Sequence, residues 1–255
     1  MSIHPILQRI GRSQTDVAGQ GAGTRSPMLE ALLADTMLAN DNVPTLVART
    51  RPHAPFQFAL KRAMDVGGAF AGLIVLAPIL LLIAIMIRLE SKGPVFFRQL
   101  RTGRNEVPFE ILKFRSMYVE QCDHAGVRLT VDGDPRVTRM GRFLRKTSLD
   151  EIPQLWNVVV GHMSLVGPRP HVPDMVAGGM NYADLVHGYE NRHLVRPGLT
   201  GLAQSRGLRG PTTDSDTAIR RILSDVEYIR TFSILLDIRI LVRTIINELR
   251  GGTGS

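Results

Sequence analysis

The feature that most constrains this chain is an uncharged apolar run of 22 residues, from Val66 to Ile87. As one helix it would extend about 33 Å at 1.5 Å per residue, which is enough to cross the hydrocarbon core of a bilayer. Pro78 lies near its centre. Because proline removes a backbone donor and clashes with the preceding turn, we expect a kink at Ala77-Pro78.

Basic residues flank this run on both sides. They are Lys61, Arg62, Arg88, Lys92, Arg98, Arg101 and Arg104. A spanning helix normally concentrates Lys and Arg on the cytoplasmic side alone. Two basic flanks therefore favour a re-entrant helix, which enters the membrane, breaks at Ala77-Pro78 and returns to the same face. A kinked single-pass anchor and a buried helix of a soluble domain are the two alternatives.

The charge and the cysteine count limit the kinds of partner. A formal net charge of +8 suits nucleic acid, an anionic membrane surface or phosphorylated substrates. Only 5% of the residues are aromatic and no recognised nucleic-acid motif is present, so we expect no nucleic-acid partner. The single cysteine, Cys122, excludes an internal disulfide and a cysteine-based zinc site. No signal peptide opens the sequence.

Four segments follow from these patterns. We predict that residues 1–55 form a flexible tail, since Gly and Pro punctuate them and only 28–38 has helical spacing. Residues 56–92 form the re-entrant membrane helix broken at Pro78, residues 93–250 form a cytoplasmic domain, and residues 251–255 form a second tail.

Within 93–250 we expect one β-hairpin and two Gly/Pro-rich loops. The β-prone runs 95–97 and 109–112 surround a turn at Thr102-Gly103-Arg104-Asn105. The loops cover 163–173 and 196–211.

Two helices are also predicted in this domain, at 137–146 and 232–249. The second is basic and amphipathic, so it either lies in the membrane interface or covers the domain's own core. The expected fold class is therefore mainly α with a small β-hairpin, in a monotopic membrane protein with interfacial amphipathic helices.

Asp150 and Glu151 are the candidate catalytic carboxylates, since they follow a strongly basic segment and precede an apolar helix. Nearby cations keep a carboxylate ionised, and an ionised Asp can attack phosphorus and form an acyl phosphate. A neighbouring carboxylate can hold a divalent cation. The alternative is structural, because Ser148-x-x-Glu151 matches a capping box and an acid in a first turn favours the helix dipole.

Basic residues beside turns and strand ends form a second candidate site. They are Arg98, Arg101, Arg104, Lys113, Arg115, Arg145 and Arg169. Guanidinium groups can fork a polyphosphate, and Arg169 stands in a rigid loop between Pro168 and Pro170. Such charges otherwise remain solvated or hold anionic lipid headgroups.

Taken together, these segments resemble the bacterial sugar transferases, also called monotopic phosphoglycosyl transferases or undecaprenyl-phosphate hexose-1-phosphate transferases. The resemblance covers about residues 58–250, in the short form without upstream membrane helices. The matching blocks are Lys61-Arg62-x-x-Asp65, Gly93-Pro94-Val95-Phe96-Phe97-Arg98-Gln99, Lys113-Phe114-Arg115-Ser116-Met117, Asp134-Pro135-Arg136-Val137-Thr138, Leu144 to Val158, Met163-Ser164-Leu165-Val166-Gly167-Pro168-Arg169-Pro170 and Arg196-Pro197-Gly198-Leu199-Thr200-Gly201-Leu202-Ala203-Gln204.

The resemblance implies a Mg²⁺-dependent reaction in two steps at the cytoplasmic face of the bacterial inner membrane. Asp150 would take a sugar phosphate from a UDP-sugar, releasing UMP, and pass it to a polyprenyl phosphate. Glu151 would assist with the metal or with protons, so both carboxylates are candidate Mg²⁺ ligands. The implied phosphate- and substrate-binding residues are Arg98, Lys113, Arg115, Arg145, Pro168, Arg169, Pro170, Thr200 and Gln204.

The resemblance also bears on substrate and partners. Residues 207–212 resemble a segment of members that use glucose, so UDP-glucose is expected first and UDP-galactose second. Expected partners are membrane lipids, downstream glycosyltransferases and, as a further option, a second copy of the chain. Two positions depart from the family pattern, because His162 replaces a usual acid and Ala77 replaces a usual serine. His162 is the one support for the alternative function, which is a catalytically silent membrane scaffold or regulator of polysaccharide assembly.

Overall fold

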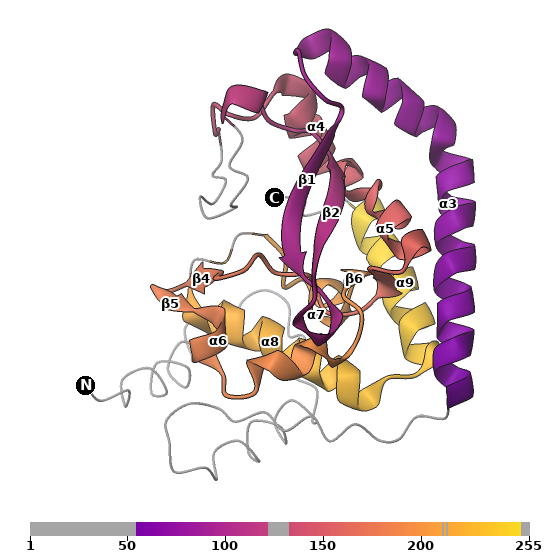
Figure 1. Ribbon diagram of the computed structural model, residues 1–255, viewed down its shortest axis with the longest axis vertical. Helices are drawn as coiled ribbons and strands as arrows, with labels where there is room; N and C mark the ends of the chain where they lie inside the picture. Colours follow the sequence, from indigo (N-terminus) through magenta and orange to yellow (C-terminus); the bar gives the residue numbers. More distant parts are fainter. Residues whose placement is uncertain (1–54, 122–132, 211, 213, 251–255) are drawn as a thin grey trace. The chain divides into compact units, whose positions relative to one another are not determined.

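A computed structural model describes residues 55–121, 133–210, 212 and 214–250 (Figure 1). The predicted tails, apart from Pro55, lie outside the described residues, as do the predicted helix at 28–38 and Cys122. The described helices and strands are α3 (Pro55–Glu90), β1 (Phe96–Thr102), η1 (Arg104–Glu106), β2 (Pro108–Phe114), η2 (Val119–Gln121), α4 (Arg139–Lys146), η3 (Leu149–Glu151), α5 (Gln154–Val160), β3 (Ser164–Val166), β4 (Val176–Ala177), β5 (Met180–Asn181), α6 (Tyr182–Leu185), η4 (Tyr189–Leu194), β6 (Gly198–Thr200), α7 (Leu202–Ser205), α8 (Ser215–Thr231) and α9 (Ile234–Leu249). The prediction of a mainly helical fold with a β-hairpin is confirmed.

The apolar run forms the long helix α3, which continues through Pro78 and bends before its C-terminal part (Figure 1). Only 11% of its most apolar 18-residue window is buried. A core helix of a soluble domain would bury most of that surface. The low burial therefore disfavours the soluble-core interpretation of this run.

Both ends of α3 pack on the domain, while its middle does not. Ala69 and Leu73 in the first half contact Leu155 and Val158 of α5. In the second half, Ile83 and Ile87 join a cluster with Phe114 and Leu144. Between these contacts most of the large apolar side chains are exposed, including Ile74, Val75, Ile79, Leu81 and Leu82.

Strands β1 and β2 form the predicted hairpin, although both are longer than the predicted runs. The antiparallel register extends from Phe96 opposite Phe114 to Thr102 opposite Pro108. Successive side chains of a strand point to opposite faces of the sheet. In this register the odd-numbered residues of both strands share one face, and on that face Gln99, Phe109 and Ile111 are buried.

The two segments predicted as loops each contain a short strand, so those predictions are wrong in part. β3 pairs with β6 in parallel, with Ser164 opposite Gly198 and Val166 opposite Thr200. Segments of three residues bounded by Gly and Pro carry no readable alternation in the sequence. A side chain at Gly198 would collide with the backbone of Gly167, so glycine permits this close pairing.

The predicted helices are confirmed as α4 and α9, and α9 has two different apolar surfaces. One side packs with α8 in a cluster that includes Ile240, Tyr228 and Phe232. The opposite side is exposed to solvent and is lined by Leu235, Ile238, Val242, Ile245 and Ile246. The helix therefore covers the core and also leaves an apolar face uncovered.

Candidate active site

The candidate carboxylates lie in a tight turn between α4 and α5. Ser148 adopts a left-handed conformation with φ of 54°, and its side chain makes no capping hydrogen bond. An N-cap residue needs an extended backbone to reach the following N–H groups. The capping-box interpretation of Ser148 and Glu151 is therefore wrong, and the two carboxylates are oriented by other contacts.

Glu151 forms ion pairs with two basic side chains at once. Lys113 Nζ lies 2.7 Å from its Oε1, and Arg169 donates to Oε1 at 2.6 Å and to Oε2 at 3.1 Å. Burial acts to raise the pKa of Glu151, but the charges of Arg169 and Lys113 outweigh it and hold that pKa well below its usual range. Glu151 is therefore an ionised link between β2 and the loop that carries Arg169.

Asp150 lies in a different environment from its neighbour. It is only 8% exposed. Within the described part of the chain, no hydrogen bond involves its carboxylate. Burial raises the pKa of Asp150 to about 6, with Lys113 lowering it and Glu151 raising it further. Two adjacent carboxyl groups thus differ in acidity, and the one without hydrogen bonds is available to react.

The hairpin face explains which predicted basic residues come together. Lys113 lies on the odd-numbered face and reaches Glu151. Arg98 lies on the other face, where it is exposed and 3.5 Å from Glu110. The structure therefore brings Lys113 to the carboxylates and leaves Arg98 on the opposite side of the hairpin.

Arg101 is not among the phosphate-binding residues that the resemblance implies, although it shares the face of Lys113. Its guanidinium donates to Gln99 at 2.5 Å and to the Pro170 carbonyl at 3.4 Å. Burial lowers the pKa of Arg101 to about 10, with a further contribution from Arg169. The two-residue period of the strand is a signal that could have identified Arg101 and separated it from Arg98.

Two predicted phosphate-binding arginines make structural contacts. Arg115 is buried and donates to the carbonyls of Ile87 and Ser91 at the C-terminal end of α3, at 3.4 and 2.8 Å. Arg145 donates to Ser116 Oγ at 2.9 Å and is near enough to Asp150 to lower its pKa. Arg145 thus belongs to the carboxylate site, whereas Arg115 closes the C-terminal end of α3.

The remaining predicted residues lie in and near the Arg169 loop. The carbonyl of Pro168 accepts from the Gly198 amide at 2.8 Å, beside the β3–β6 pair. Thr200 Oγ1 lies 2.7 Å from Thr244 Oγ1 of α9, and Gln204 donates to the Leu199 carbonyl at 3.2 Å. These two side chains are buried and bind neighbouring protein groups.

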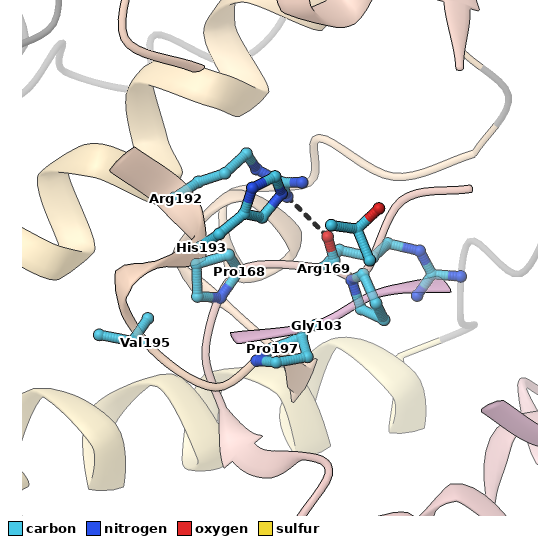
Figure 2. A pocket seen from close by; sticks show the side chains of 9 residues that line it. Gly103, Pro168, Arg169, Arg192, His193, Val195 and Pro197 are labelled. Atoms are coloured by element: carbon cyan, nitrogen blue, oxygen red, sulfur yellow. Dashed lines mark hydrogen bonds between the residues drawn. The ribbon is translucent and has the colours of Figure 1, made fainter. Parts of the chain in front are cut away.

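A small pocket lies behind the Arg169 loop (Figure 2). Its walls include Gly103, Pro168, Arg169, Arg192 and His193, and the figure marks the bond from Arg192 to the Arg169 carbonyl. Sequence reasoning missed Arg192, because nothing in its local sequence indicates a buried arginine.

The sequence profile of the bacterial sugar transferase family matches residues 56–251. The chain belongs to this family. Exopolysaccharide production protein PSS of Rhizobium leguminosarum bv. phaseoli is 53% identical over 195 residues, which cover 76% of this chain and 98% of the relative. The UDP-glucose:undecaprenyl-phosphate glucose-1-phosphate transferase of Escherichia coli strain K12 is 44% identical over 205 residues, 80% of this chain and 43% of the relative.

A third relative is named for a different sugar. The UDP-N-acetylgalactosamine-undecaprenyl-phosphate N-acetylgalactosaminephosphotransferase of Aeromonas hydrophila is 40% identical over 198 residues, 78% of this chain and 45% of that protein. This sugar transferase thus spans nearly all of the Rhizobium relative but less than half of the other two.

The two carboxylates of this sugar transferase differ in how far they are available to hold Mg²⁺. Among the described residues, no three His, Cys, Asp or Glu side chains gather as a metal site. Mg²⁺ in phosphoryl-transfer sites is commonly held by one or two carboxylates together with substrate phosphates. Asp150 is open to such an ion, while both oxygens of Glu151 already face Lys113 and Arg169.

We predict an acid limb near pH 6 in the activity of this sugar transferase. If Asp150 is the predicted nucleophile, it reacts as the carboxylate, and its raised pKa means that the group becomes protonated as the pH falls through about 6. A profile of kcat/KM between pH 5 and 8 should rise about tenfold per pH unit below the limb and level off above it. A profile without an inflection above pH 5 would contradict a buried nucleophile.

Proposed function

We propose that this sugar transferase moves glucose 1-phosphate from UDP-glucose to undecaprenyl phosphate and releases UMP. One observation carries the proposal. The Asp150 carboxylate, which has no hydrogen bond among the described residues, lies beside Glu151, whose charge is neutralised by Lys113 and Arg169. Four relatives named for UDP-glucose are 44–48% identical to this chain, whereas the relative named for UDP-N-acetylgalactosamine is 40% identical. The product would start a repeat unit of exopolysaccharide, capsule or O-antigen for downstream glycosyltransferases.

The reaction takes two displacements at one phosphorus atom. A carboxylate oxygen of Asp150 attacks the phosphorus that bears the sugar, and the bond to UMP breaks with its electron pair leaving on UMP. An oxygen of undecaprenyl phosphate then attacks the same phosphorus and expels the Asp150 carboxylate. No proton is abstracted in either step, because both nucleophiles are already anions. Lys113, Arg101 and Arg169 supply positive charge around the diphosphate.

Mg²⁺ would supply further charge neutralisation at the diphosphate when bound. Asp150 is the residue best placed to hold it, with Glu151 as its neighbour. The two residues otherwise divide the work, since Asp150 supplies the nucleophile and Glu151 orients Lys113 and Arg169.

The membrane arrangement in this proposal is a re-entrant α3 on the cytoplasmic side of the bacterial inner membrane. Both flanks of the apolar run are tied to the same domain. Lys61 donates to Asp237 at 2.6 Å, and at the other end Glu90 accepts from the backbone amide of Arg139 at 2.7 Å. A spanning helix would separate these flanks by the thickness of a bilayer. Residues 93–250 would then form the catalytic domain on one face.

α9 would add a second membrane contact. Its exposed apolar side carries Leu235, Ile238 and Val242, and Arg239 and Arg243 stand beside them. An amphipathic helix with a basic rim binds a surface that contains anionic lipids. Membrane lipids are therefore proposed as partners of α3 and α9 together.

We predict that aqueous reagents reach both flanks of α3 from the same side. Single cysteines introduced as Phe56→Cys and Leu89→Cys, in a Cys122→Ser background, replace side chains that are 73% and 82% exposed. In inside-out membrane vesicles both should react with an impermeant maleimide, and in right-side-out spheroplasts neither should. Val75→Cys, at a site 74% exposed in the protein, is the matched control and should stay unlabelled in both. Labelling of the two flanks from opposite sides would indicate a single-pass helix.

The activity itself is tested by UMP release. Purified protein with Mg²⁺, undecaprenyl phosphate and a panel of UDP-sugars should release UMP fastest with UDP-glucose, and chelation by EDTA should stop it. Preference for another UDP-sugar would change the substrate. No release with any UDP-sugar would favour the catalytically silent scaffold.

A further inference from the structure

The loop that carries Arg169 is held through its carbonyl groups. Pro168 and Pro170 have no N–H, so at these two positions the backbone can accept hydrogen bonds but cannot donate them. Four successive carbonyls each accept from another element. The bonds are Gly198 N to Pro168 O (2.8 Å), Arg192 Nη2 to Arg169 O (2.6 Å), Arg101 Nη1 to Pro170 O (3.4 Å) and Thr102 N to His171 O (3.1 Å).

Arg192 makes the shortest of these four hydrogen bonds, and its side chain is deeply buried. Its side chain is 1% exposed, and Asp225 of α8, 4% exposed, accepts from it at 2.7 and 3.2 Å. Arg192 also donates to the hydroxyl of Tyr189 at 3.3 Å. Figure 2 shows the Arg192 guanidinium pointing toward the Arg169 carbonyl. A buried, paired guanidinium has few alternative positions, so it fixes the carbonyl that it binds.

We infer that Arg192, held by Asp225, is a positioning residue that sets where the Arg169 guanidinium meets Glu151 and the donor diphosphate. The inference rests on the proposed function. The chain of contacts is continuous, from Asp225 to Arg192, to the Arg169 backbone, and through the Arg169 side chain to Glu151. Neither Arg192 nor Asp225 touches the reacting groups, so each acts through Arg169.

The direct test is a double-mutant cycle with Arg169. Asp225→Asn keeps the shape of the side chain but removes the charge that holds Arg192, and kcat/KM for the UDP-sugar should fall about tenfold or more. In an Arg169→Ala background the same Asp225→Asn change should alter kcat/KM less than twofold, because the residue through which it acts is gone. An equal loss in both backgrounds would overturn the inference.

Glu227→Gln is the matched control on the same helix. Glu227 forms a buried bidentate pair with Arg206 at 2.5 and 2.6 Å, and that pair has no bond to the Arg169 loop. Both variants should lower the melting temperature, but only Asp225→Asn should change kcat/KM more than twofold. If Asp225→Asn does not fold, Arg192→Lys replaces it in the same cycle, since lysine cannot bind Asp225 and the carbonyl with a planar fork. Equal kinetic losses in the Glu227→Gln variant would reduce Arg192 to a general stability role.

A readout independent of turnover separates this inference from the proposed function. Nitrogen-15 NMR of arginine side chains, with Arg169→Lys to assign the signal, follows the contact of the Arg169 guanidinium with Glu151. Asp225→Asn should shift or broaden the Arg169 signal, and Glu227→Gln should leave it in place. A change in a protein that never releases UMP would keep the positioning role and remove the proposed function. An unchanged Arg169 signal would contradict the positioning role.

Discussion

Replacing Asp150 with Asn should lower UMP release at least about 10⁴-fold while leaving the protein folded. The amide has the size of the carboxylate but cannot attack phosphorus. Single-turnover assays with Mg²⁺, UDP-glucose and undecaprenyl phosphate measure this loss. Turnover within tenfold of the parent protein would exclude Asp150 as the nucleophile.

The same substitution should stabilise the protein at neutral pH. The pKa of Asp150 is about 6 in the folded protein and near 3.8 when unfolded, so ionisation at pH 7 costs the folded state on the order of 3 kcal/mol. Since a raised carboxyl pKa means that the native state binds the proton more tightly, this cost grows between pH 3.8 and 6 and is complete above 6.

Denaturant unfolding of the parent and Asp150→Asn proteins at pH 7 and pH 4 measures the difference. The gain in the free energy of unfolding should be present at pH 7 and nearly absent at pH 4. A helix-capping role for Asp150 predicts a loss of stability instead, so the sign of the change separates the two roles.

Glu151→Gln should lower kcat about 10²- to 10³-fold and move the acid limb of the pH profile to lower pH. The activity falls because Lys113 and Arg169 lose the charge that holds them together. The limb moves because the negative charge of Glu151 raises the pKa of Asp150, so its removal makes Asp150 more acidic.

Lys113→Met supplies the opposite control. Lys113 lowers the pKa of Asp150, and its loss should therefore move the limb to higher pH. If the acid limbs of the Glu151→Gln and Lys113→Met variants move in the same direction, the titrating group is not Asp150.

Local pattern was sufficient to predict three elements of the fold. The uncharged run gave α3, the apolar periodicity gave α9, and β-prone runs around Gly103 gave the hairpin. Strand alternation, applied to that hairpin, would also have separated Lys113 from Arg98.

Contacts between distant segments could not be predicted in this way. Arg192 and Asp225 are 33 residues apart, and Lys61 and Asp237 are 176 apart, so no local period links them. The capping box failed for a related reason. The left-handed backbone of Ser148 is imposed by the junction between α4 and α5, and a four-residue motif does not encode that junction.

The central claim is that Asp150 becomes covalently phosphorylated by the donor. Intact-mass spectrometry of protein incubated with Mg²⁺ and UDP-glucose, with undecaprenyl phosphate withheld, tests it most directly. We expect the mass to increase by one hexose phosphate, with the adduct located on Asp150 by peptide mapping and lost when the lipid acceptor is added. Efficient product formation on addition of acceptor, in a protein that never carries this adduct, would contradict the mechanism.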